Sequence, residues 1–253
     1  MPGWLVAGGW GLLGGSALLL GALVAWFATL PARLIAAVMA VGSGVLISAV
    51  AFDLMDEAYR TGGFRAAAAG FLTGALVYTL ANVALSRSGA RHRKRSGSEP
   101  HARQPAADAN SGAAIAIGAL LDGIPESVVI GTSLIGGGRV SAVMVAAVFL
   151  SNVPEGLASA AGMKRAGRSA SYVFGVWGGI AAASGLAAAF GYVALGGAAP
   201  AVLGAVTAVA AGAILAMLVD TMIPEATSAT HAYSGLIAVI GFLAAFVLSK
   251  AGG

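Results

Sequence analysis

The sequence predicts an all-α membrane protein, a bundle of eight transmembrane helices with inverted repeats. Of its 253 residues, 58% are hydrophobic and 9% are charged, and the mean hydropathy is +0.90. A soluble domain usually carries about 25% charged residues, so this chain cannot cover a surface that faces water. The 38 glycines fit helices that approach one another closely in lipid. The absence of cysteine excludes disulfides and thiolate metal ligands.

A helix that crosses a bilayer needs about 20 mostly apolar residues. Eight stretches meet this length, at about 4–28, 33–58, 64–85, 112–134, 140–163, 169–196, 200–224 and 233–250. Turn signals separate several of them, namely Pro31, the triple glycine 136–138 and Pro200. We therefore expect a single multi-pass domain over 1–253 in the plasma membrane (the cell inner membrane). Its partner is the lipid bilayer rather than a nucleic acid.

One long polar segment, 86–111, interrupts the apolar stretches and holds six of the fourteen Lys and Arg residues. We expect it to be a basic cytoplasmic loop, because blocks of like charge are usually solvated segments. With this loop inside, ten basic residues fall on the inner side of the membrane and four on the outer side, as the positive-inside rule requires. Both termini are then predicted to lie outside.

Eight of the ten acidic residues fall in four short motifs with apolar flanks, at 52–57, 121–127, 151–156 and 220–225. A carboxylate inside a membrane costs about 3 kcal/mol on insertion scales and by default marks a functional site. No Lys or Arg lies within these four motifs. The expected partner of the acids is therefore a cation from solution.

The spacing within the motifs places pairs of oxygen ligands on one helix face, because residues four apart lie one turn apart. Three of the motifs also carry a proline directly before glutamate, and proline frees the backbone carbonyl four residues earlier. The predicted metal ligands are Asp122, Glu126, Asn152, Glu155, Ser151, Asp53, Glu57, Asp220 and Glu225.

A rise of 1.5 Å per residue places the motifs 121–127 and 151–156 near the membrane midplane. The same estimate places 52–57 near the outer mouth and 220–225 near the inner mouth. Similar motifs on helices of opposite direction are typical of inverted repeats with a binding site at the midplane.

The motifs Asp122-Gly123-Ile124-Pro125-Glu126 and Ser151-Asn152-Val153-Pro154-Glu155-Gly156 resemble the metal motifs of the ZIP (Zrt-, Irt-like) family. The resemblance implies eight spans, outer termini and transport of a divalent metal, zinc or a related metal such as iron or manganese. The metal would be the substrate, no organic cofactor is implied, and the protein would not be an enzyme. A homodimer is left open.

Asp122 and Ser151 stand where the family carries histidine, and oxygen-rich sites suit manganese better than zinc. Members of the family often carry a further glutamate in the sixth span, whereas 169–196 contains no acid here. The sequence therefore predicts one bound metal rather than two.

Two other functions use the same acids. A channel for protons or cations needs only a row of carboxylates along a pore. A metal-dependent intramembrane hydrolase needs a general base beside the metal, and the chain contains neither a Gly-x-Gly-Asp nor a His-Glu-x-x-His motif.

Overall fold

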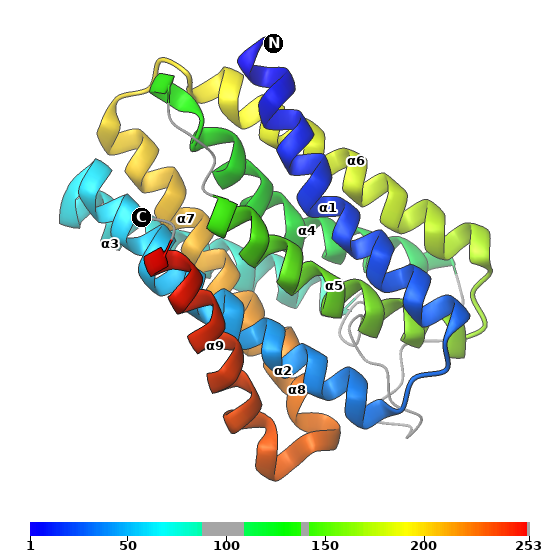
Figure 1. Ribbon diagram of the computed structural model, residues 1–253. Coiled ribbons are helices and arrows are strands. Elements are labelled where there is room, and N and C mark those ends of the chain that lie inside the picture. The colour runs from blue at the N-terminus through cyan, green and yellow to red at the C-terminus, as the bar shows by residue number, and fades with distance from the viewer. Residues whose placement is uncertain (88–108, 138–141, 252–253) are drawn as a thin grey trace.

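The structure, a computed structural model, describes residues 1–87, 109–137 and 142–251, and the regular structure in these ranges is helical. The prediction of an all-α protein is thus confirmed for the described residues. Figure 1 shows long helices packed side by side. Their order is α1 Gly3–Phe27, α2 Ala32–Ala49, the π-helix η1 Val50–Leu54, α3 Met55–Leu85, α4 Ala109–Thr132, the 3₁₀-helix η4 Ile135–Gly137, α5 Ala142–Arg165, α6 Ala170–Leu195, α7 Pro200–Met217, the π-helix η5 Leu218–Met222, α8 Ile223–Thr230, the 3₁₀-helix η6 His231–Tyr233 and α9 Ser234–Ala251.

Several helices have the length and composition of membrane spans. Among the described residues, four continuous helical stretches are long and apolar enough, namely Gly3–Phe27, Ala32–Leu85, Ala170–Leu195 and Pro200–Ser228. Ser234–Lys250 is a shorter apolar helix. The side chains that these helices turn outward are also apolar. Leu72, Leu186 and Leu236 are 70%, 72% and 63% exposed, as expected of side chains that face lipid rather than water.

The stretch Ala32–Leu85 is 54 residues long, which corresponds to about 80 Å of helix, more than twice the thickness of a bilayer core. Gly63 interrupts it with a φ of 74° and a ψ of 174°, a conformation that residues with a side chain rarely adopt. The chain therefore changes direction at Gly63, between the predicted stretches 33–58 and 64–85.

The polar segment 86–111 is shorter at both ends than predicted, because helical backbone continues to Arg87 and begins again at Ala109. The rest of the predicted loop, 88–108, lies outside the described residues. Beyond the predicted stretch 200–224, the helix likewise continues through α8 to Thr230.

Two pairs of helices, α3 with α7 and α2 with α9, pack closely through reciprocal glycines. A Cβ atom on Gly74 of α3 would overlap the carbonyl oxygen of Val209, and one on Gly212 of α7 would overlap that of Phe71. The same relation holds between α2 and α9, where the glycines are Gly44 and Gly241 and the carbonyls belong to Ala238 and Val41. Small residues on both partners let the backbones touch, which is how helices associate in lipid.

The contacts of α1 with α5 and of α4 with α6 are built in the same way. Gly21 of α1 abuts the carbonyl of Val153, and Gly156 of α5 abuts that of Leu18. Between α4 and α6 the reciprocal glycines are Gly131, against Ala188, and Gly191, against Val128. The helices α4 and α5, which carry the central acidic motifs, are therefore each held against the bundle by direct backbone contact.

The reciprocal glycines give the first prediction. We expect Gly74→Ala and Gly212→Ala each to destabilise the protein by about 1–3 kcal/mol, the usual cost of overpacking, because each new methyl group meets a backbone carbonyl that cannot turn aside. The measurement is the midpoint of thermal unfolding in detergent. Gly175→Ala and Gly179→Ala are matched controls in α6, since a Cβ atom at these exposed positions meets nothing within 4 Å. Equal midpoints for all four variants would contradict the packing described.

Candidate functional site

Three carboxylates are buried in the middle of α4 and α5. The side chains of Asp122, Glu126 and Glu155 are 3%, 2% and 4% exposed, and the neighbouring Ser151 and Asn152 are buried as well. Asp122 and Glu126 lie one turn apart on α4, while the other three residues lie on α5. All five residues of the predicted central site are thus shielded from the surface, where a charged group is costly unless it is neutralised or hydrogen-bonded.

Neutral hydrogen-bond partners orient three of the buried polar groups, two of them from other helices. The hydroxyl of Tyr78, on α3, donates to Oδ1 of Asp122 at 2.8 Å. The amide of Asn152 donates to the carbonyl of Gly14, on α1, at 3.0 Å, and this leaves its Oδ1 as an acceptor. The Ser151 hydroxyl donates to the Val148 carbonyl of its own helix at 2.9 Å. These bonds orient the side chains and add no positive charge.

Tyr78 belongs to the site although no acidic motif contains it. Its side chain is 1% exposed, and a buried tyrosine hydroxyl usually has a hydrogen-bond partner, so its place inside an apolar stretch was the one available signal. The sequence could not show that this partner is Asp122, because 44 positions separate the two residues.

Within the described residues, no group of three or more His, Asp or Glu side chains lies close enough together to hold a metal ion. The carboxylates of α4 and α5 are therefore not gathered into one shell in this structure. Any shell built here also draws on other oxygens, such as Oδ1 of Asn152. The assignment of these residues as metal ligands stays a prediction.

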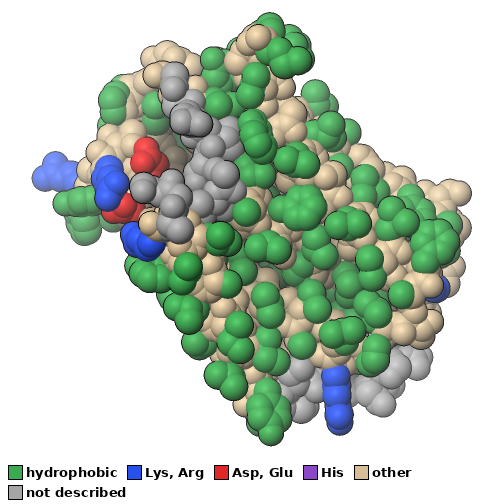
Figure 2. All heavy atoms as spheres, viewed as in Figure 1, with side chains coloured by type: hydrophobic (Ala, Val, Ile, Leu, Met, Phe, Trp, Pro, Cys, Tyr) green, Lys and Arg blue, Asp and Glu red, His purple; other side chains and the backbone are tan. Residues whose placement is uncertain are grey.

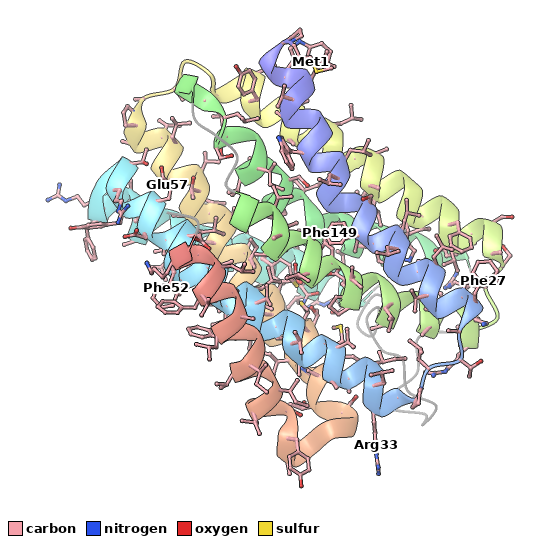
Figure 3. The ribbon with its side chains drawn as sticks, in the orientation of Figure 1. Met1, Phe27, Arg33, Phe52, Glu57 and Phe149 are labelled. Atoms are coloured by element: carbon pink, nitrogen blue, oxygen red, sulfur yellow. The ribbon has the colours of Figure 1, made fainter. Side chains whose placement is uncertain are left out.

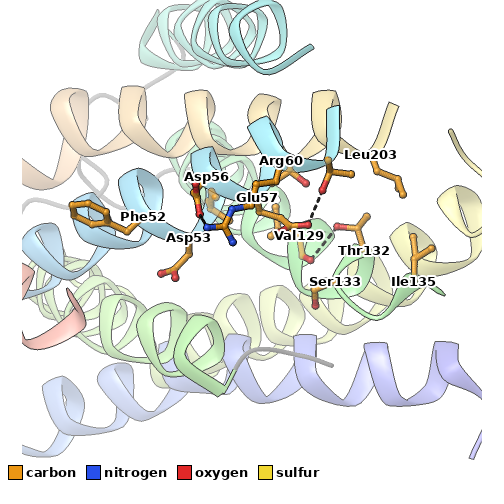
Figure 4. A pocket seen from close by; sticks show the side chains of 13 residues that line it. Phe52, Asp53, Asp56, Glu57, Arg60, Val129, Thr132, Ser133, Ile135 and Leu203 are labelled. Atoms are coloured by element: carbon orange, nitrogen blue, oxygen red, sulfur yellow. Dashed lines mark hydrogen bonds and ion pairs between the residues drawn. The ribbon is translucent and has the colours of Figure 1, made fainter. Parts of the chain in front are cut away.

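A cavity of about 510 Å³, which we call the acidic cavity, lies between α3, α4 and α7. Figure 4 shows three acids at its wall, Asp53, Asp56 and Glu57, with Thr132 at the end of α4 and the following Ser133 nearby. Arg60 forms an ion pair with Asp56 at 3.0 Å, and the Thr61 hydroxyl donates to Glu57 Oε1 at 2.7 Å. The predicted pair Asp53 and Glu57 thus lines a hollow that is large enough for hydrated ions.

The acidic cavity reaches close to the buried carboxylates of α4. Val129 lines it, and Val129 follows Glu126 by three residues, about 4.5 Å along the helix axis. Figure 3 places Phe52 and Glu57 at the same end of the molecule, and the space-filling view in Figure 2 shows acidic side chains gathered at that end, in an otherwise largely hydrophobic face. The cavity therefore approaches the buried site from one end of the bundle.

Both chain termini lie at this cavity end. Near the N-terminus, Gly3 packs against Tyr192 in the last turns of α6. The next helix, α7, begins five residues after α6 ends, and its Leu203 lines the acidic cavity. Near the other terminus, Ser249 of α9 is hydrogen-bonded to Asp53. At the opposite end, which we call the basic end, Lys164 donates to the Trp26 carbonyl at 2.5 Å.

The acids of the fourth motif differ from one another in burial. Asp220 is exposed and accepts a hydrogen bond from the amide of Asn82, on α3, at 3.2 Å. Glu225, at the start of α8, is only 2% exposed. Glu225 is therefore shielded like the central carboxylates, whereas Asp220 lies at the surface.

Asp53 and Asp220 both lie in π-helices, η1 and η5, which sequence periodicity did not predict. A π turn inserts an extra residue into a helix and often marks a functional position. Each π-helix follows an α-helix of 18 residues, α2 or α7. The two segments therefore share one local design.

No family model matches the sequence, and no curated protein shows a significant similarity to it. The argument for function therefore depends on the residues and their arrangement.

The acidic cavity gives the second prediction. Because the chain contains no cysteine, an introduced cysteine is the only thiol that a reagent can label. We expect Thr132→Cys and Ser133→Cys to react with a membrane-impermeant thiol reagent, because both positions line the cavity and reactive thiols need access to water. Ser159→Cys, at a position 2% exposed within α5, is the matched control and should react at least about ten times more slowly. If Thr132→Cys and Ser133→Cys reacted as slowly as Ser159→Cys, the cavity would be closed to water.

Proposed function

We propose that this protein carries a divalent metal cation, zinc or a related metal such as iron or manganese, across a membrane. The observation that carries the proposal is the burial of Asp122, Glu126 and Glu155 inside two apolar helices. Removing carboxylates from water is costly, and a divalent cation bound among them offsets that cost. Two of them, Glu126 and Glu155, belong to the Pro-Glu motifs that resemble those of the ZIP transporters.

The chemistry of the surrounding groups fits a hard or borderline divalent cation. The buried polar residues Asp122, Glu126, Glu155 and Asn152 carry carboxylate and amide oxygens, and the chain has no thiol ligand. Such ligands suit manganese and also bind zinc. The bond from Tyr78 orients Asp122 while leaving its negative charge in place. Binding and release of the cation need no covalent step, so we propose a transporter rather than an enzyme.

The route begins at the acidic cavity, where Asp53 and Glu57 attract a hydrated cation. Negative side chains lining a cleft raise the local concentration of cations. From Val129 the path continues one turn along α4 to Glu126, and past the central carboxylates it leads toward Glu225 and Asp220.

We propose that the helices form eight membrane spans arranged as two inverted repeats. The packing supports this. If α1 is taken as the equivalent of α6, α2 of α7, α3 of α9 and α4 of α5, each main helix contact has an equivalent contact in the structure. The contact of α3 with α7 becomes that of α9 with α2, and the contact of α1 with α5 becomes that of α6 with α4. Each of these four contacts has its own pair of reciprocal glycines.

Residues related by this exchange also match in sequence position. Asp53 and Asp220 are 167 positions apart (53 to 220), and so are Gly74 and Gly241 (74 to 241). The first pair consists of the π-helical aspartates and the second of reciprocal glycines. The shared separation of these two pairs supports a duplicated unit, and inverted units place a binding site at their interface.

The remaining parts of the proposal follow from topology. Ten of the fourteen Lys and Arg residues fall in sequence segments that we propose to be cytoplasmic, so we propose that the basic end faces the cytoplasm and that both termini lie outside. The membrane is then the plasma membrane, and the acidic cavity faces outward. A homodimer is compatible with the exposed apolar faces of the outer helices.

The third prediction tests the central carboxylates in proteoliposomes. We expect Glu126→Gln and Glu155→Gln to lower the initial rate of metal uptake at least about tenfold, the smallest loss typical of changes around a metal site, because an amide of equal size lacks the charge that binds the cation. The metals assayed are zinc, manganese and iron(II). Asp56→Asn is the matched control, because Asp56 already pairs with Arg60 at the rim of the acidic cavity, and it should retain most of the uptake.

Two outcomes would contradict this proposal. Normal uptake by both glutamine variants would remove the central carboxylates from the route. An ohmic current of protons or monovalent cations through the wild-type protein, without saturable uptake of a divalent metal, would instead identify a channel.

A further inference from the structure

The aspartates of the two π-helices accept hydrogen bonds of the same kind at opposite ends of the bundle. At the cavity end, the hydroxyl of Ser249 donates to Oδ1 of Asp53 at 2.7 Å. At the basic end, the amide of Asn82 donates to Oδ2 of Asp220 at 3.2 Å. Both donors lie in the last turn of their helix, Ser249 in α9 and Asn82 in α3.

The two bonds are related by the exchange of the repeats. The donors Asn82 and Ser249 are 167 positions apart (82 to 249), the same separation as their acceptors Asp53 and Asp220. Each bond nevertheless joins different repeats, because Asp53 pairs with the donor on α9 and Asp220 with the donor on α3. An incidental polar contact at one helix end would not be expected to recur at the equivalent position of the other repeat.

The chemistry of the donors suits carboxylates that meet a cation. A hydroxyl or an amide orients a carboxylate without neutralising it, whereas a basic side chain forms an ion pair, as Arg60 does with Asp56. The ammonium of Lys250, next to Ser249, lies over the rings of Phe52 and Phe246, 5.8 Å from each centroid, and it also attracts the Asp53 carboxylate at longer range. Each hydrogen bond engages one oxygen of its aspartate and leaves the other for a ligand.

We propose that Ser249 and Asn82 are positioning residues that orient the carboxylates of Asp53 and Asp220 for cation capture and release at the two mouths of the route. This inference rests on the proposed cation transport. Because each residue acts at one mouth, each affects the metal concentration needed on its own side of the membrane. A role limited to holding two helices together would instead weaken the protein as a whole and affect both sides alike.

The experiment measures metal transport in proteoliposomes of a single orientation, with manganese or zinc supplied to one side and then to the other. We expect Ser249→Ala to raise the apparent KM for metal at the cavity end about three- to tenfold, the range for loss of one hydrogen bond, with little change in kcat and in the KM at the basic end. Asn82→Ala should give the mirror image, with a raised KM at the basic end only.

Conservative variants and a control separate positioning from stability. Ser249→Thr and Asn82→Ser keep a donor at each position and should restore most of the affinity. Ser16→Ala is the control, because the Ser16 hydroxyl bonds only the Leu13 carbonyl of its own helix, and it should leave both KM values unchanged.

The outcomes are distinct. A KM raised at one side by Ser249→Ala and at the other by Asn82→Ala, with rescue, supports the inference. Suppose instead that the wild-type protein transports metal, but that both alanine variants behave like Ser16→Ala or change the KM equally on the two sides. This result overturns the inference and leaves the proposed function standing. Absence of divalent metal transport by the wild-type protein overturns the proposed function, and this inference with it.

Discussion

The cost of holding carboxylates away from water is the constraint on which the rest of the structure depends. Asp122, Glu126 and Glu155 are each 4% exposed or less, in helices whose other residues are mostly apolar. A folded chain keeps such groups only where other interactions repay the loss of hydration. Hydrogen bonds such as that from Tyr78 offset part of this cost, and a bound divalent cation would offset much more of it. A protein that exchanges such a cation with both sides of a membrane gives these residues a reason to be there.

Close helix packing holds the two helices that carry those residues in place. Helices α4 and α5 lie against α6 and α1 through glycines that touch the backbone of the neighbouring helix. Since lipid supplies no hydrophobic force between helices, close van der Waals contact holds such a bundle together. The exchange that relates these contacts also relates the two π-helical aspartates and their donors. This relation supports the proposal that one packing scheme, used twice, builds the central region and the two proposed mouths of the route.

Composition and the positions of the acids were enough to predict the helical class and the motifs with buried carboxylates. Helix periodicity could not predict η1 and η5, because the residues that form a π turn do not differ from those of the α-helices around it. The sequence did not identify the hydrogen-bond donors Tyr78, Asn82 and Ser249, for another reason. Each lies in an apolar stretch outside the acidic motifs, and its role comes from a contact with a residue at least 44 positions away. Such contacts arise from tertiary packing and leave no local pattern.

The central claim is that the carboxylates of α4 and α5 bind one divalent cation. The most direct measurement is anomalous scattering from crystals of the protein soaked in manganese or zinc, recorded at the absorption edge of the metal. The account predicts one well-occupied peak among Asp122, Glu126 and Glu155, because their three negative charges fall short of the four positive charges of two bare cations. Two well-occupied central peaks within about 4 Å of each other would contradict the single-metal claim. Peaks confined to the surface, with none between α4 and α5, would contradict the account as a whole.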